Sequence, residues 1–140
     1  MLSFSKTLYH DIIAHCQQAY PKEACGLLAA NADGRIGQIY RMTNIEDSAI
    51  SYAMDPNEQL RVMKQMRQQG QAMVGIYHSH IASEAYPSPV DVHLAVYPEV
   101  SYVLVSLQDR DRPAIRSYRI VDGTITPEDL QIGGVPNRNA

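Results

Sequence analysis

The chain has 140 residues, the length of a single domain that can bury a core of its own. Hydrophobic residues make up 45% of the sequence and charged residues 19%, a composition that excludes disorder over most of the length. The formal charge of −3, without a cluster of Lys and Arg, disfavours nucleic acid or an anionic membrane as partner, and no apolar run reaches the roughly 18 residues that cross a bilayer.

Periodicity divides the chain into alternating helices and strands. Apolar residues recur every three or four positions in the helical segments, whereas the strands are short apolar or alternating runs between turn residues. The run 72–79 is almost wholly apolar, which predicts a central strand buried on both faces. In chain order we expect a helix over 5–20, strands over 24–30, 35–42 and 51–54, a helix over 56–69, the strand 72–79, a short helix from 88, and strands over 101–107 and 114–121.

Strands interleaved with helices predict an α/β (α+β) fold in which helices flank a mixed β-sheet. The sequence shows neither an internal repeat nor a linker, so we expect one domain over 1–122. Residues 123–140 lose the periodicity and are expected to form a tail that is partly flexible.

Two histidines stand at the end of the expected central strand. His78 and His80 are two positions apart, and because strand side chains alternate in direction, both imidazoles can point to the same side. Asp91 follows in the segment that begins with Ser88. Two imidazoles and one carboxylate leave one position of a tetrahedral zinc ion open for water, as in a catalytic site.

These residues also have other interpretations. Ser88-Pro89-Val90-Asp91 is the pattern of a capping box with proline at the first helical position. Two histidines and one carboxylate are also the ligands of iron oxygenases, although those favour a β-rich jelly roll over a chain with two strong helical patterns. A histidine pair with Ser and Asp at these offsets arises by chance in roughly one in a thousand chains of this composition, which favours the metal site.

The spacing of His78 and His80, seven residues, Ser88, two residues and Asp91 resembles the signature of the JAMM (MPN-plus) metalloproteases. The segment 21–26, Pro-Lys-Glu-Ala-Cys-Gly, resembles the upstream segment of that family with its catalytic glutamate. The stretches 51–56 and 74–77 resemble those of its compact prokaryotic members, so that the likeness covers about residues 6–121. Ile81 departs from the family, which often has proline there.

The resemblance implies a cytidine-deaminase-like layered MPN domain and a role for each site residue. His78, His80 and Asp91 would hold one zinc ion per chain, Glu23 would be the general acid/base, and Ser88 would donate a hydrogen bond to the oxyanion. Without the resemblance, Glu23 beside a lysine would be interpreted as a solvated surface charge.

The remaining candidates have plainer interpretations. Cys25 is conceivable as a nucleophile but is expected to be a small buried apolar residue. His93 would lie about 200° around a helix from the aspartate ligand and so face away from the metal. His10 and His15 are expected on the surface or half-buried on the first helix, and Glu84 is expected to be exposed in a loop where it could contact a substrate.

The resemblance implies a cytoplasmic zinc peptidase that hydrolyses a peptide or isopeptide bond at the Gly-Gly end of a ubiquitin-like or sulfur-carrier protein. Two cysteines are too few for a disulfide scaffold and agree with a reducing cytoplasm. Two alternatives remain: a non-catalytic MPN-type scaffold, which would carry no stoichiometric zinc, and the iron oxygenase.

Overall fold

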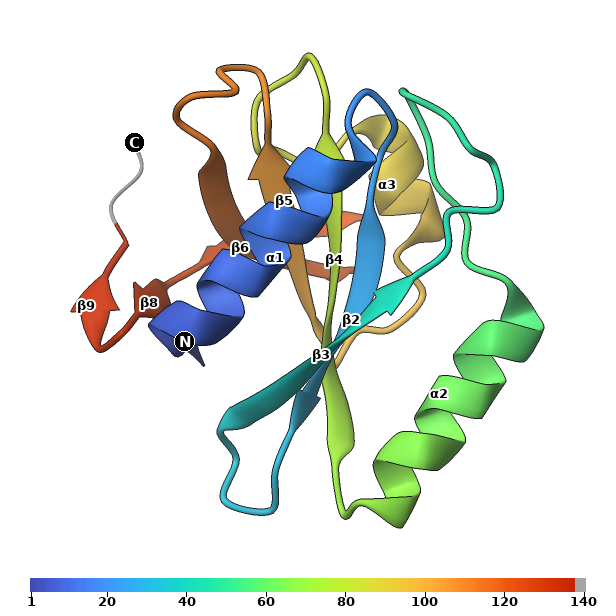
Figure 1. Cartoon of the computed structure of the whole chain (residues 1–140), viewed down its shortest axis with the longest axis vertical. Helices are drawn as coiled ribbons and strands as arrows, with labels where there is room; N and C mark the ends of the chain where they lie inside the picture. The colour runs from blue at the N-terminus through green and yellow to red at the C-terminus, as the bar shows by residue number, and fades with distance from the viewer. Residues whose placement is uncertain (138–140) are drawn as a thin grey trace.

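The computed structural model describes residues 1–137, and its centre is a six-stranded mixed sheet (Figure 1). The strand order is β3-β2-β4-β5-β6-β7, in which β4 and β5 run parallel and all other neighbours are antiparallel. The strand at 72–80 is therefore central, as its apolar sequence predicts. The strands are β2 (Cys25–Ala30), β3 (Ile36–Met42), β4 (Ala72–His80), β5 (Ser101–Ser106), β6 (Ala114–Val121) and β7 (Thr124–Glu128).

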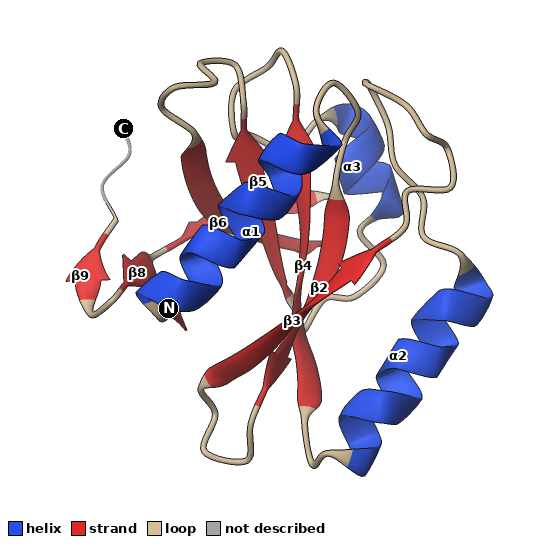
Figure 2. Cartoon of the chain, viewed as in Figure 1, coloured by secondary structure: helices blue, strands red, loops and turns tan. Residues whose placement is uncertain are grey.

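Helices cover both faces of this sheet (Figure 2). One core contains the buried side chains of α1 (Lys6–Ala19) together with Val103 and Val105, and the other contains Leu104 and Met66 of α2 (Pro56–Gln68). Successive residues of β5 thus enter opposite cores, as the two-residue period of a strand requires. The expected layered fold, a mixed sheet flanked by helices, is confirmed.

The same alternation on β4 fixes where its two histidines point. Tyr77 lies in the core beneath α1, where Gly26 of β2 makes room for it, because a Cβ at that glycine would collide with the tyrosine ring. Ile76 lies in the opposite core, next to α2. His78 and His80, which follow Ile76 by two and four positions, therefore face the α2 side of the sheet.

The last part of the described chain contains more regular structure than its sequence indicates. β7 pairs with β6 along Ser117 to Val121, and a second sheet joins β1 (Leu2–Phe4), β8 (Leu130–Ile132) and β9 (Val135–Pro136). These strands are short, two of them contain proline, and pairing with distant segments defines them, so local periodicity does not reveal them. Residues 138–140 of the expected tail lie outside the described residues, and the domain boundary at 122 stays a prediction.

The strand expected at 51–54 is wrong. Only a single bridge joins Met54 to Asn44, and the rest of this segment is a loop. The Asn44 side chain holds the backbone of this loop in place of a neighbouring strand, because it donates to the Ser51 oxygen and accepts from the Ala53 nitrogen.

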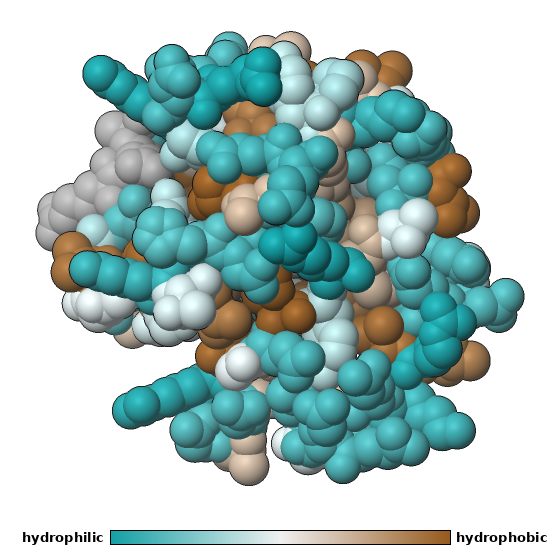
Figure 3. Space-filling model, in the orientation of Figure 1, coloured by the Kyte–Doolittle hydropathy of each residue, from teal (hydrophilic) through white to brown (hydrophobic). Residues whose placement is uncertain are grey.

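The molecular surface over α1 is mainly hydrophilic, with apolar side chains visible beside the helix (Figure 3). Exposed large hydrophobic side chains elsewhere include Ile50, Val90 and Leu94. Within residues 1–137, no helix is both long and apolar enough to cross a membrane.

Candidate metal centre

The carboxyl end of β4 presents two histidines to the start of a short helix, α3 (Pro89–Leu94). His78 and His80 are 3% and 5% exposed, so water is almost excluded from both side chains. Nε2 of His78 lies 3.1 Å from Asp91 Oδ1, and Nε2 of His80 lies 2.9 Å from Asp91 Oδ2. One ligand atom from each of the three residues lies within 4.8 Å of the others, so the structure brings the three expected ligands together.

Asp91 is placed by the capping box of α3. The Ser88 side chain accepts from the Asp91 backbone nitrogen at 3.1 Å, and the Ser88 backbone nitrogen donates to Asp91 Oδ2 at 2.8 Å. The two interpretations of this motif therefore coexist, because the cap leaves Oδ1 directed toward His78. Burial alone would raise the pKa of the Asp91 carboxyl, but the contacts with His78 and His80 hold that pKa well below its usual range.

The two imidazoles differ in their surroundings. Burial lowers the pKa of His78. Burial would also lower the pKa of His80, but its hydrogen bonds to Asp91 and to the Glu84 carbonyl raise that pKa above its usual value. The bond to Glu84 joins Nδ1 to the backbone oxygen at 2.9 Å, which leaves Nε2 facing the carboxylate.

The chemistry of these donors fits a divalent metal. Nε2 of His78 is fully buried, and because its 3.1 Å contact with Asp91 Oδ1 lacks hydrogen-bond geometry, the atom makes no hydrogen bond among the residues that the structure describes. Such an orphaned atom is costly in a protein interior unless a ligand satisfies it. Two imidazole nitrogens and one carboxylate oxygen are the donor set of a zinc site with a position open to substrate or water.

Glu23 lies immediately before β2 and is 6% exposed, which rules out the interpretation as a solvated surface charge. Burial raises the pKa of its carboxyl from 4.5 to about 7; the charge of His80 lowers this pKa, and those of Asp91 and Glu46 raise it. The carboxyl is thus near enough to the histidine and aspartate cluster to interact with it electrostatically, and it titrates near neutrality.

Asn44, which sequence reasoning missed, fixes the backbone at Glu23. Its Nδ2 donates to the carbonyl oxygens of Glu23 and Ser51 at 3.1 and 3.0 Å. Its Oδ1 accepts from the backbone nitrogens of Glu46 and Ala53, both at 3.1 Å. One amide therefore connects Glu23 to the loop that follows β3, a long-range role that no local pattern signals.

Tyr52, in that loop, stacks on His78 with ring centroids 4.5 Å apart. The same tyrosine lines an apolar pocket of about 240 Å³ together with Met54, Ile76 and Leu94. Ile76 precedes His78 by two positions on β4, so the pocket adjoins the metal ligands along the face of the sheet. In the sequence, only the resemblance of residues 51–56 to the family indicated a functional role for this segment.

The other candidate residues from the sequence lie outside the cluster of metal donors. Cys25 is fully buried, and burial raises the pKa of its thiol to about 12, which makes it a poor nucleophile. His10 and His93 are exposed, and His15 is half-buried with Nδ1 2.6 Å from the Tyr77 hydroxyl. These outcomes agree with the interpretations drawn from the sequence.

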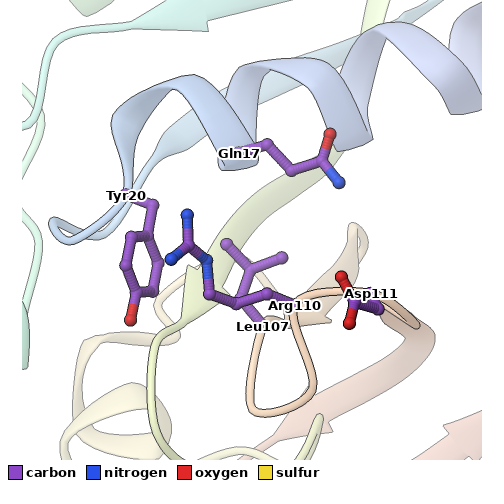
Figure 4. Close-up of a pocket in the computed structure, with 5 residues that line it drawn as sticks. All are labelled: Gln17, Tyr20, Leu107, Arg110 and Asp111. Atoms are coloured by element: carbon purple, nitrogen blue, oxygen red, sulfur yellow. The ribbon is translucent and has the colours of Figure 1, made fainter.

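A second pocket, of about 420 Å³, lies at the end of α1, and none of its lining residues is a candidate site residue (Figure 4). The Arg110 guanidinium stacks over the Tyr20 ring, with its carbon 3.9 Å from the ring centroid. Gln17, Leu107 and Asp111 complete the lining. This set holds neither a metal donor cluster nor a buried charge, so the β4 and α3 junction carries the chemistry.

Comparison with known proteins identifies relatives along almost the whole chain. The family model described as prokaryotic homologs of the JAB domain matches residues 5–121. The CysO-cysteine peptidase of Mycobacterium tuberculosis is 45% identical over 126 residues, which cover 89% of this chain and 86% of that protein. A probable TtuB-protein conjugate cleaving protease of Thermus thermophilus is 30% identical over 124 residues, 88% of this chain and 78% of that protein.

Solved structures agree with this result. The solution structure of a protein from Desulfitobacterium hafniense superposes with a TM-score of 0.86 at 36% identity, covering 94% of this chain and 92% of that one. A JAB1/MPN domain protein from Archaeoglobus fulgidus superposes with a TM-score of 0.62 at 18% identity, covering 94% and 98% of the two chains, and shares the fold.

Proposed function

The chain belongs to the JAMM (MPN-plus) family, as a prokaryotic homolog of the JAB domain, and from this premise we propose that it is a zinc-dependent peptidase. One observation carries the proposal: three buried or half-buried metal donors lie beside a buried glutamate that titrates near pH 7. A scaffold domain has no need for this combination, which costs stability unless it serves chemistry.

His78, His80 and Asp91 would hold the zinc ion. Zinc supplies hydroxide at neutral pH, because it lowers the pKa of a water molecule from 15.7 towards about 7. The protein's part is to keep the site dry and to orient the donors. The stacked ring of Tyr52 contributes to both tasks, because it shields His78 from water and limits the rotation of its imidazole.

Glu23 would act as the general acid/base. Its carboxylate would accept the proton of the attacking water and then give it to the nitrogen of the leaving amine, which departs poorly as an anion. A pKa of about 7 suits a group that must both take and release a proton near neutral pH. Proton transfer of this kind contributes about 10²–10⁴-fold to the rate.

Ser88 would stabilise the negative oxygen that develops on the attacked carbonyl. Its Oγ already accepts from the Asp91 backbone nitrogen, so its own hydrogen remains free to donate. A donor in such a position is worth about 2.7–4 kcal/mol.

The substrate we propose is a sulfur-carrier or ubiquitin-like protein, cleaved at a peptide or isopeptide bond that follows its C-terminal Gly-Gly. Support comes from two relatives, a CysO-cysteine peptidase and a probable TtuB-protein conjugate cleaving protease. We place the reaction in the cytoplasm, in keeping with two free, buried cysteines.

A direct test is to load the full chain with zinc and incubate it with carrier proteins that bear extensions after Gly-Gly. One carrier should end in a single additional cysteine and another should be linked to a lysine side chain. Mass spectrometry should show release of the extension and a new Gly-Gly end, and the matched Glu23→Gln variant should leave both carriers intact while still binding zinc.

The alternatives make opposite predictions in the same experiment. A non-catalytic scaffold would purify without stoichiometric zinc and leave every carrier intact. An iron oxygenase would require Fe²⁺ and consume oxygen, and oxygen-dependent turnover would overturn the peptidase proposal.

A further inference from the structure

The loop 81–87 connects β4 to the start of α3 and so lies between the metal ligands. Three consecutive backbone carbonyls of this loop, those of residues 83, 84 and 85, interact with side chains of the main sheet. The contacts are Ser106 Oγ to the Ser83 oxygen at 2.6 Å, His80 Nδ1 to the Glu84 oxygen at 2.9 Å, and the Tyr118 hydroxyl to the Ala85 oxygen at 2.6 Å.

The two outer donors come from strands that are well fixed. Ser106 ends β5 and is 4% exposed, and Tyr118 lies in the middle of β6 and is 3% exposed. These strands follow β4 in the sheet, so the donors and the histidine belong to one hydrogen-bonded unit. The loop residue Tyr86 also packs edge-on against the Tyr118 ring, with centroids 5.5 Å apart.

Holding the carbonyls on either side fixes the peptide of Glu84 between them. The Glu84 oxygen accepts the hydrogen of His80 Nδ1, which orients the ring so that Nε2 is the nitrogen facing Asp91 and the one that could bind a metal. The Glu84 side chain is exposed and takes no part in this contact. The orientation of the imidazole therefore depends on where the loop backbone is held.

We propose that Tyr118 and Ser106 are positioning residues for His80, which clamp the loop so that the Glu84 carbonyl sets the imidazole for metal binding. The inference rests on the proposed function, because it assigns the purpose of the clamp to the zinc site. Neither residue belongs to the cluster of metal donors, and both act through the backbone of residues 83–85.

The test compares Tyr118→Phe, Ser106→Ala and the double variant with the wild type, all as full chains. Tyr40→Phe is the matched control, because Tyr40 is also buried in the main sheet and its hydroxyl donates at 2.8 Å to the side chain of Gln71, outside the loop 81–87. Zinc affinity is measured by competition with a chromophoric chelator, and urea unfolding of the metal-free proteins measures stability separately.

We expect Tyr118→Phe and Ser106→Ala to weaken zinc binding by about tenfold each, and the double variant by up to about 100-fold, the range for residues that orient a ligand. Tyr40→Phe should lose stability without losing zinc affinity. With Co²⁺ as the probe, the visible spectrum should change in the clamp variants and not in Tyr40→Phe, and Ser106→Thr, which keeps the hydroxyl, should recover affinity.

Wild-type zinc affinity and an unchanged cobalt spectrum in the folded double variant would overturn the clamp. That result is distinct from failure of the proposed function, in which the wild-type chain itself binds no zinc or cleaves no carrier. Equal losses of affinity in the clamp variants and in Tyr40→Phe would also overturn it, because the effect would then follow general destabilisation.

Discussion

Replacing Glu23 by glutamine removes a buried charge with little change of shape, and this should stabilise the metal-free protein while it stops catalysis. Burial raises the pKa of the carboxyl from 4.5 to about 7, so between these values the folded state binds more protons than the unfolded state. Stability due to this group therefore falls as pH rises from 4.5 to 7 and stays low above it. The shift corresponds to about 3 kcal/mol at pH 8 and to less than about 1 kcal/mol at pH 5.

The measurement is urea unfolding of metal-free wild type and Glu23→Gln at both pH values, since all other titrating groups are shared and cancel in the difference. We expect the variant to be more stable by about 3 kcal/mol at pH 8 and nearly equal at pH 5. Carrier cleavage by the zinc-loaded variant should drop by about 10²–10⁴-fold. Bound zinc should narrow the stability difference, because a nearby cation favours the charged carboxylate.

A variant that is no more stable than wild type at pH 8 would refute the burial argument. Near wild-type turnover of the variant would separately refute the assigned role of Glu23 as general acid/base.

Four further outcomes follow from the contacts at the site. His78→Ala or Asp91→Ala should purify without zinc, as elemental analysis can show, and retention of stoichiometric metal would contradict the ligand assignment. Ser88→Ala should keep zinc but lose about 1 kcal/mol of stability with the N-cap and about 10²–10³-fold in turnover, whereas a stability loss alone would leave it only a capping residue. Cys25 should resist iodoacetamide at pH 8 until the protein unfolds, as mass spectrometry of the native protein can test, because the thiol is buried and its pKa is raised to about 12. Asn44→Asp should destabilise the chain by about 2–4 kcal/mol and slow turnover, because an oxygen would replace the NH₂ group that donates to the carbonyls of Glu23 and Ser51. Unchanged stability in urea unfolding would contradict the role of this amide in holding the two backbone segments together.

The parts of the site that sequence reasoning predicts are those that local geometry determines. His78 and His80 share a face because strands alternate, and Ser88 and Asp91 are linked by the capping box, so spacing alone indicates both pairs. The burial of Glu23 depends on a loop more than twenty residues away, and only the family resemblance singled it out. Asn44 and Tyr118 act through contacts that no short pattern encodes.

The fold divides in the same way. Helices α1 and α2 and the strands β2 to β6 follow clear sequence patterns and lie close to their expected ranges, whereas β1 has no counterpart among the expected elements. The strands β7, β8 and β9 are short, and each forms because another strand offers it a partner: β6 pairs with β7, β1 with β8, and β8 with β9. Strand propensity cannot predict such segments, because pairing with a neighbouring strand defines them and their composition does not.

The capping box has a consequence for interpreting related sequences. Ser88 and Asp91 begin α3 whether or not the chain performs chemistry, so a descendant that has lost its activity still has a structural reason to keep both. His78 and His80 do not begin a secondary-structure element in this way, because each places a polar ring in the protein interior at the end of an apolar strand. The histidine pair is therefore the better indicator of an active family member, and its loss beside an intact Ser-x-x-Asp would identify an inactive one.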